Sequence, residues 1–296
     1  MTGVGEETAR LAERFEEHRA RLRSVAYRML GSLDEADDAV QEAWVRFSAA
    51  GADEVVNLGG WLTTIVSRVC LNMLRARAAR PETLAGPRVP DPVLSPSEGP
   101  TPEQEALLAD SVGLALLVVL DTLTPAERVA FVLHDVFDFP FGEIAPMLNR
   151  TPEAARQLAS RARHRVRAAG TREPDGAVAA QQAVVAAFFT AARAGDLNAL
   201  LELLDPDVVL RTDGFAGAPA ALRGAEAVSG AALGGANPRA EFRPVLVNGA
   251  AGMLITVRGR PAALMAFTVV DGRITAVDGI TDPRRVRRLV TEHAAQ

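Results

Sequence analysis

The sequence predicts a multidomain protein in which two all-α helical domains are followed by one α+β domain. Its 296 residues are enough for two or three domains, and 48% of them are hydrophobic, so each domain can bury a core. Seven of the 18 prolines fall within residues 81–102, a density that breaks helices and inner strands. Apolar residues keep a helical period on both sides of this break and a strand-like period from residue 208 onward.

These breaks predict five segments. They are a helical domain at 1–80, a proline-rich linker at 81–101, a helical domain at 102–169, a short linker at 170–176 and an α+β domain at 177–296.

Composition excludes several classes of protein. The only cysteine, Cys70, permits no disulfide framework and no thiolate zinc cluster, so a reducing, cytoplasmic location is expected. The N-terminus lacks the pattern of an export signal, and the longest apolar stretch, residues 112–120, is too short to span a membrane. We therefore expect no membrane association.

Three amphipathic stretches predict the helices of the first domain. The apolar stripe of the first helix ends at Gly31, and Ser32 with Glu35 forms a capping box that opens the second. The third stripe begins at Trp61 and ends at Met73. The acidic side chains of the second helix lie opposite its apolar stripe, so they face solvent or a partner.

The second domain has the sequence pattern of a helix-turn-helix. Thr124-Pro125 and Thr151-Pro152 each begin a helix, a short helix is predicted over 140–148, and Asn149 suits a left-handed turn. The helix after Thr151 is rich in arginine. Its exposed polar residues are Arg156, Gln157, Ser160, Arg161, Arg163 and His164.

The third domain begins with helices at 178–194 and 197–204. Strands are then predicted at 208–210, 242–247, 253–257, 263–270 and 274–277. Asp271-Gly272 between the last two is a hairpin signal. Helices followed by antiparallel strands predict a curved sheet over helices, forming a cone with an apolar cavity.

Charge is strongly local although the net charge is only −5. Residues 150–167 hold six arginines, and a helix-turn-helix with this charge is expected to read DNA in the major groove. The arginines of 68–80 fit either a solvated helix face or, beside Trp61, a surface for unstacked bases. The acids between Asp34 and Glu42 either complement the helix dipole on a solvated face or bind a basic partner.

Together these segments resemble bacterial sigma factors. Residues 15–47, above all the run LDEADDAVQEAW at 33–44, resemble their second conserved region, and 123–167 resemble the fourth. The run WLTTIVSRVCLN at 61–72 resembles the part that binds the promoter −10 element. With a proline-rich link in place of a third region, the chain is similar to the extracytoplasmic-function (ECF) group. The third domain resembles the SnoaL/NTF2-like domain fused to one subgroup.

The resemblance implies partners and roles. The partners would be RNA polymerase core, through the clamp helices of its largest subunit and its flap, and promoter DNA. The residues that would bind core are Asp34, Asp37, Asp38, Gln41 and Glu42. Those that would bind and help to open the −10 element are Trp61, Arg68, Asn72 and Arg75. The arginine-rich helix, with Arg156, Gln157, Ser160, Arg161, Arg163 and His164, would read the −35 element.

Two family motifs that couple the fused domain to the others are altered here. A linker motif of the form Y-x-G-x-W-L-P-E-P is replaced by LAGPRVPDP at 84–92, without its aromatic residues. A DGGGK-like motif is replaced by DGFAG at 213–217, without the lysine. Asp213, Gly214 and Gly217 are the interdomain regulatory residues that the resemblance implies.

Two other functions compete with transcription initiation. The chain could be a polymerase-independent helix-turn-helix regulator, in which the acidic helix has no task. The third domain could be a small cyclase or isomerase, which needs an acid–base pair in its cavity. Its candidate groups are Asp205, Asp207, Asp213, Asp278, Asp282 and His293.

We expect no catalytic residues, no cofactor and no metal site. His18, His134 and His164 lack ligand spacing. A small-molecule ligand of the third domain is compatible with the predicted cavity. The C-terminal arginines form either an inhibitory tail or a solvated helix face; they are Arg284, Arg285, Arg287 and Arg288.

Overall fold

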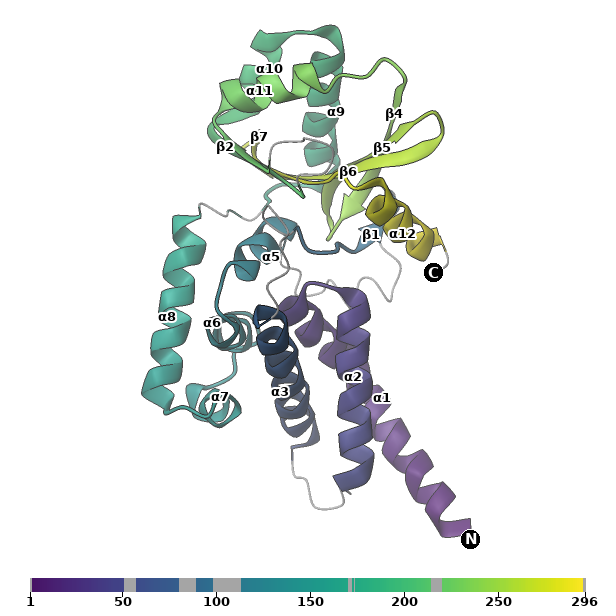
Figure 1. Cartoon of the computed structure of the whole chain (residues 1–296), viewed down its shortest axis with the longest axis vertical. Coiled ribbons are helices and arrows are strands. Elements are labelled where there is room, and N and C mark those ends of the chain that lie inside the picture. The colour runs from purple at the N-terminus through teal and green to yellow at the C-terminus, as the bar shows by residue number, and fades with distance from the viewer. Residues whose placement is uncertain are drawn as a thin grey trace. The chain divides into compact units, whose positions relative to one another are not determined.

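Two compact units make up the chain in the computed structural model (Figure 1). The structure describes residues 2–50, 57–79, 89–97, 113–169, 172, 174–213 and 220–294. Unit 1 comprises 1–82, 106–110 and 120–169, and unit 2 comprises 83–105, 111–119 and 170–296. Helix α5 (Leu114–Asp121) spans the boundary between them in sequence.

Unit 1 begins with three long helices that pack side by side. They are α1 (Thr2–Leu30), α2 (Leu33–Ala50) and α3 (Leu58–Ala78). Gly31 adopts a positive φ of 70°, which ends α1 as the sequence predicts. Four aromatic rings hold the bundle together, with neighbouring centroids 5.2 to 5.9 Å apart; they belong to Phe15, Trp44, Phe47 and Trp61.

The helix-turn-helix is also present in unit 1. Its elements are α6 (Pro125–Phe131), the single turn η1 (Val132–Val136), α7 (Phe141–Leu148) and α8 (Pro152–Ala168). Thr124 and Glu127 form the capping box of α6. Asn149 makes the turn before α8 in the left-handed conformation, with φ 54° and ψ 50°. These features confirm the helix-turn-helix pattern.

The two helical parts of unit 1 contact each other. Helix α3 packs against α6 and α7, and α1 packs against η1. Arg28 of α1 is buried with its guanidinium carbon 5.0 Å from the ring centroid of Phe137. Arg77 of α3 pairs with Glu35 and lies 3.9 Å from Asp121. Whereas the sequence separates 1–80 from 102–169, the described helices of both other than α5 form one compact unit, because the faces between them are apolar and ion-paired.

Unit 2 is built on a seven-stranded sheet with the order β1-β4-β5-β6-β7-β2-β3. The strands are β1 (Leu94–Ser95), β2 (Leu204–Thr212), β3 (Ala221–Arg223), β4 (Ala240–Val247), β5 (Ala250–Val257), β6 (Arg260–Val270) and β7 (Arg273–Ile280). Only β2 and β7 pair in parallel. The helices are α9 (Val178–Ala194), α10 (Leu197–Leu203), α11 (Ala225–Gly234) and α12 (Pro283–Ala294).

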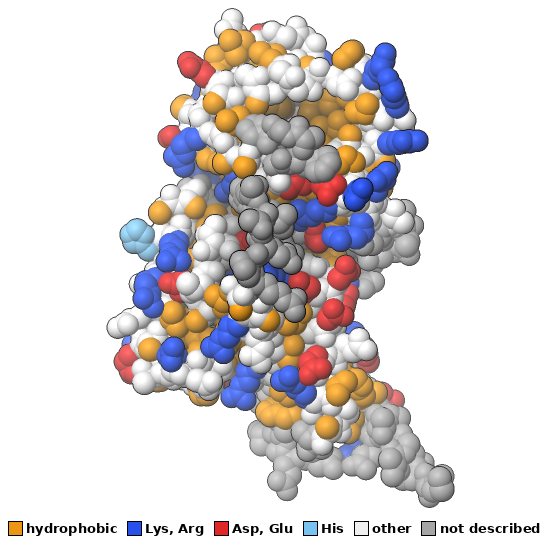
Figure 2. Space-filling model, viewed as in Figure 1, with side chains coloured by type: hydrophobic (Ala, Val, Ile, Leu, Met, Phe, Trp, Pro, Cys, Tyr) orange, Lys and Arg blue, Asp and Glu red, His pale blue; other side chains and the backbone are white. Residues whose placement is uncertain are grey.

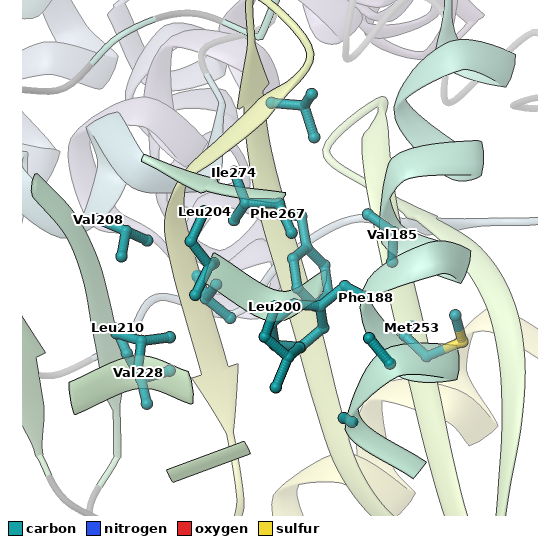
Figure 3. Close-up of a cluster of buried hydrophobic side chains, with 14 of the residues drawn as sticks. Val185, Phe188, Leu200, Leu204, Val208, Leu210, Val228, Met253, Phe267 and Ile274 are labelled. Atoms are coloured by element: carbon teal, nitrogen blue, oxygen red, sulfur yellow. The ribbon is translucent and has the colours of Figure 1, made fainter. Parts of the chain in front are cut away.

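The core of unit 2 lies between one face of the sheet and helices α9, α10 and α11 (Figures 1 and 3). Phe188 from α9, Leu200 from α10 and Val228 from α11 meet strand residues that alternate toward them, such as Phe267. Helix α12 packs instead against β6 and contacts β1, burying Val286. The α+β fold predicted for the third domain is therefore confirmed.

Three hairpins give the sheet its meander. Each has a two-residue turn with positive φ at both positions; the turns are Asn248-Gly249, Arg258-Gly259 and Asp271-Gly272. The sequence prediction identified the last one only. It also missed β1, β3 and α11, which are short or weakly patterned.

No helix in the described part of the chain is both long and apolar enough to cross a membrane.

Candidate nucleic-acid interface

Helix α8 presents an open polar face. Thr151 caps it by accepting a hydrogen bond from the Ala154 N–H, at 3.3 Å. The buried residues Ala155, Ala159 and Ala162 attach the helix to the rest of the unit, and Leu158 is half-buried. The opposite side is exposed, and its side chains at three- and four-residue steps are Gln157, Ser160 and His164.

The arginines predicted to bind the −35 element are each contacted from within unit 1. Arg156 lies with its guanidinium carbon 5.4 Å from the ring centroid of Phe141 on α7. Arg161 and Arg165 both approach Glu127, at 3.5 and 2.9 Å. These contacts hold the arginines beside the open face. They leave the side chains of Arg161 and Arg165 63% and 49% exposed.

Arg163 has a different acid as partner. Its Nε lies 3.5 Å from Asp135 of η1. Burial raises the pKa of Asp135, and the charges of Arg163 and His134 oppose that rise. The basic side chains of α8 are spread along the left edge of the molecule in Figure 2. All six predicted residues lie on α8. Within the described chain only Arg161 and Arg163 carry an acid partner, whereas Arg156, Gln157, Ser160 and His164 do not.

Helix α3 carries the residues predicted to bind the −10 element. Asn57 caps it by accepting from the Gly60 N–H, at 3.0 Å. Arg68, Asn72 and Arg75 follow at four- and three-residue steps and are all exposed, so they share one face. Arg68 donates from Nη2 to the Pro146 carbonyl of α7, at 3.4 Å.

Trp61 plays a different part in this arrangement. It is half-buried, with its ring centroid 5.8 Å from that of Phe47 in an edge-on contact. The indole thus belongs to the aromatic cluster of the bundle as well as to the start of α3. The structure groups Arg68, Asn72 and Arg75 and places Trp61 at the far end of the same helix.

The acidic residues of α2 form one exposed surface. All five predicted core-binding residues are exposed: Asp34, Asp37, Asp38, Gln41 and Glu42. Asp37 accepts two hydrogen bonds from Arg23 of α1, at 2.6 and 3.0 Å, and Glu42 accepts one from Arg46, at 2.9 Å. Asp34 and Asp38 make no ion pair with any described residue. The free negative charge of this surface therefore centres on those two carboxylates.

The sequence prediction missed an apolar residue on the same surface. Val45 is 54% exposed, and it follows Gln41 by four residues and Glu42 by three. An exposed β-branched residue at the end of an acidic stripe offers an apolar contact to a partner that binds the acids. The heptad-like spacing from Asp38 to Val45 is the signal that could have revealed it.

Of the predicted interdomain residues, Asp213 is described and Gly214 and Gly217 lie outside the described residues. The Asp213 carboxylate accepts hydrogen bonds from the N–H groups of Thr281 and Asp282, at 2.9 to 3.1 Å. It thereby joins the end of β2 to the start of α12. This contact lies within unit 2.

The described part of the predicted linker is bound to unit 2. Residues 94–95 form β1 beside β4, and the Val93 N–H donates to Asn248 Oδ1 at 2.7 Å while the Asn248 N–H donates to the Val93 carbonyl at 2.8 Å. Asp91 accepts from Arg285 Nε at 2.7 Å and from Arg288 Nη2 at 2.9 Å. We call this set, Asp91, Arg285 and Arg288, the Asp91 clasp.

The clasp revises the prediction for residues 81–101. Residues 89–95 lie buried on unit 2, where the sequence predicted only a linker with extended character. The reason is long-range pairing, because the acid and its arginines are 194 and 197 residues apart. Of the C-terminal arginines, two are thus ion-paired to the segment that precedes α5.

The acids proposed for an enzyme do not line the cavity of unit 2. None of the five aspartates is among the cavity-lining residues that the structure describes. Asp278 is buried and accepts from Arg211 at 2.6 and 3.1 Å. Burial raises its pKa, and the Arg211 charge opposes this. The side chain of His293 lies outside the described residues.

A helical bundle with an acidic helix, followed by a helix-turn-helix with an arginine-rich second helix, defines a promoter-specificity subunit of the sigma type. Residues 14–80 match the family model Sigma-70 region 2, and residues 113–166 match Sigma-70, region 4.

The chain belongs to the ECF RNA polymerase sigma factors, which direct the polymerase to promoters. It is 38% identical over 289 residues to the ECF RNA polymerase sigma factor SigJ of Mycobacterium tuberculosis, covering 91% of each chain. It is 34% identical to the probable ECF sigma factor SigI of the same organism, covering 93% of this chain and 94% of that one. The crystal structure of SigJ aligns with a TM-score of 0.73, at 36% identity, over 93% of this chain and 97% of SigJ.

Proposed function

We propose that three surfaces of unit 1 divide the work of promoter recognition. The open face of α8 reads the −35 element, the face of α3 that carries Arg68, Asn72 and Arg75 binds the −10 element, and the acidic surface of α2 binds the clamp helices of the polymerase. The observation that supports this most directly is the open face of α8, which follows a tight left-handed turn and has buried alanines behind it. That geometry suits entry into the major groove.

The chemistry of each surface fits its task. Gln157 has the donor and acceptor needed for adenine, and Arg156 has the planar fork needed for guanine. Arg161 follows Gln157 by four residues and has the same fork as Arg156, while Arg163 and Arg165 can hold phosphates. On α3, guanidinium groups next to an amide can hold the backbone and the bases of a single strand after the duplex opens.

The closed contact within unit 1 implies a change of shape on DNA binding. Arg68 of α3 is hydrogen-bonded to the Pro146 carbonyl of α7, and α3 packs against α6 and α7. Arg68 is exposed, but this hydrogen bond occupies one of its guanidinium donors on α7 instead of leaving it for DNA. We infer that the two helical parts separate when the chain joins the polymerase, and that the Asp91 clasp lets unit 2 influence the segment between them.

The test of core binding reverses one charge. Asp38→Arg places a cation where the acidic surface has an unpaired carboxylate, so it should weaken binding to purified core polymerase by about tenfold or more. Glu202→Arg, at an exposed position of α10 in unit 2, is the matched control and should bind core normally. Binding is measured by fluorescence anisotropy of the labelled full chain, and activity by runoff transcription.

Each result has a definite meaning. Normal core affinity for Asp38→Arg would show that the acidic surface is only solvated. Tight, sequence-specific duplex binding without any core association by the unaltered chain would support a polymerase-independent regulator instead.

A further inference from the structure

Unit 2 encloses an apolar cavity of about 700 Å³. It lies between the core-facing side of the sheet and helices α9 and α11. Phenylalanines form much of its wall: Phe189 has ring centroids 4.7 Å from Phe242 and 5.7 Å from Phe267, and Phe188 lies 5.6 Å from Phe189. Hydrophobic side chains gather over this part of unit 2 in Figure 2. A volume of this size holds a small organic molecule.

The polar groups of the cavity are few and mostly neutral. The described lining includes Thr212, Asn237 and Thr281 but no aspartate, glutamate or histidine. Such a lining has hydrogen-bonding groups for orientation but lacks the acid–base pair that an isomerase of this fold would use. The cavity is therefore suited to binding a molecule rather than to transforming it.

One charged group of the lining is an arginine. Arg193 stands in the last turn of α9, exposed, with its guanidinium carbon 5.4 Å from the ring centroid of Phe242. No described carboxylate pairs with it. The segment 214–219, which follows β2, contains no acidic residue in its sequence. The cation–π contact directs the guanidinium to the rim of the cavity without neutralising its charge.

We propose that this cavity binds a small apolar molecule that carries an anionic group, with Arg193 receiving the anion at the rim. The apolar part would gain free energy by burial against the phenylalanines and Met265. The anion would stay at the rim, because a charge moved deeper would lose its hydration without a partner. Charge complementarity at Arg193 thus selects for anions over neutral molecules of the same shape.

A pair of fluorescent probes tests the selection. 1-Anilinonaphthalene-8-sulfonate and N-phenyl-1-naphthylamine share one apolar skeleton, and only the first carries an anion. The full chain should bind the sulfonate at least several-fold more tightly than the neutral probe. Arg193→Gln should weaken the affinity for the sulfonate by about tenfold and leave the affinity for the neutral probe unchanged.

Two further variants locate the site. Arg243→Gln makes the same change of charge on β4 at an exposed residue that points to the other side of the strand from Phe242, and it should change neither affinity. Ala263→Phe places a ring inside the cavity and should abolish binding of both probes, while circular dichroism shows that the sheet is intact.

The proposal is overturned if the full chain binds both probes with equal affinity or binds neither. It is also overturned if Arg193→Gln lowers the affinity for the sulfonate no more than Arg243→Gln does, or if Ala263→Phe binds both probes normally. The test measures only the affinity of the chain for the two probes. Its outcome is therefore independent of whether the promoter-recognition proposal succeeds.

Discussion

Two arginine-rich helices of this molecule, α8 and α12, have similar compositions and different surroundings. On α12, Arg285 is paired with Asp91 and its side chain is only 17% exposed. On α8, Arg161 is paired with Glu127 yet remains 63% exposed. The acid is buried in both cases, so the difference lies in whether the arginine is buried with it. The comparison teaches that a count of basic residues does not show which of them can reach DNA.

The largest effect is expected from breaking the clasp on α12. Asp91→Ala leaves Arg285 without its carboxylate in a largely buried place, which should cost unit 2 about 2 kcal/mol in its free energy of unfolding. Both tryptophans, Trp44 and Trp61, lie in unit 1. Urea denaturation followed by far-ultraviolet circular dichroism should therefore show an earlier transition in the variant, while tryptophan fluorescence should not.

Asp207→Ala is the control for that measurement. Asp207 pairs with Arg223 at 3.8 Å, and the two side chains are 86% and 61% exposed, so its loss should change stability by less than about 0.5 kcal/mol. Equal effects of the two substitutions would mean that the clasp is no more than a surface ion pair.

An effect of comparable size, on promoter discrimination instead of stability, is expected on the reading face of α8. Gln157→Ala and Arg156→Ala should each weaken discrimination between the correct −35 element and an altered one by about 1–3 kcal/mol. Arg287→Ala, at an exposed position of α12, should leave it unchanged. Runoff transcription from paired promoters that differ in the −35 element measures this. Unaltered promoter preference in both α8 variants would contradict the assignment of the recognition helix.

The smallest effect should come from releasing arginines on α8. Glu127→Gln keeps a capping-box residue for α6 but removes the charge that holds Arg161 and Arg165. Affinity for any duplex should rise roughly threefold, with a steeper dependence on salt, because two cations become free for phosphates. Glu143→Gln, an exposed acid on α7, is the control of equal charge. If Glu143→Gln raised the affinity for duplex DNA as much as Glu127→Gln, the effect would come from the change in net charge alone.

The helices and hairpins with local signals could be predicted from the sequence. The bounds of α9 agree with the predicted 178–194, Thr124 caps the helix that it was predicted to begin, and Asn149 makes the predicted turn. Caps and turns depend on residues only a few positions apart, so their sequence patterns can be recognised without the structure.

Features that depend on distant residues could not be predicted. β1 exists because β4 pairs with it, and the Asp91 clasp exists because α12 packs where residues 89–95 lie. Likewise, nothing local distinguishes Asp37, which Arg23 engages, from Asp38, which is free. The candidate residues of the interface could thus be named in advance, but not which of them are already occupied.

The attachment of Val93 to the turn at Asn248 affects how this protein can be dissected. A shortened chain that ends at Ala169 would still contain Val89, Val93 and Leu94, which are buried in the intact molecule, yet it would lack most of unit 2, to which they belong. Without its partner strand, this apolar segment would be exposed and prone to pair with the strand edges of other chains. A change in activity after that deletion could then arise from self-association as well as from lost regulation by unit 2. Point substitutions in α12 avoid this, because the rest of unit 2 stays in place.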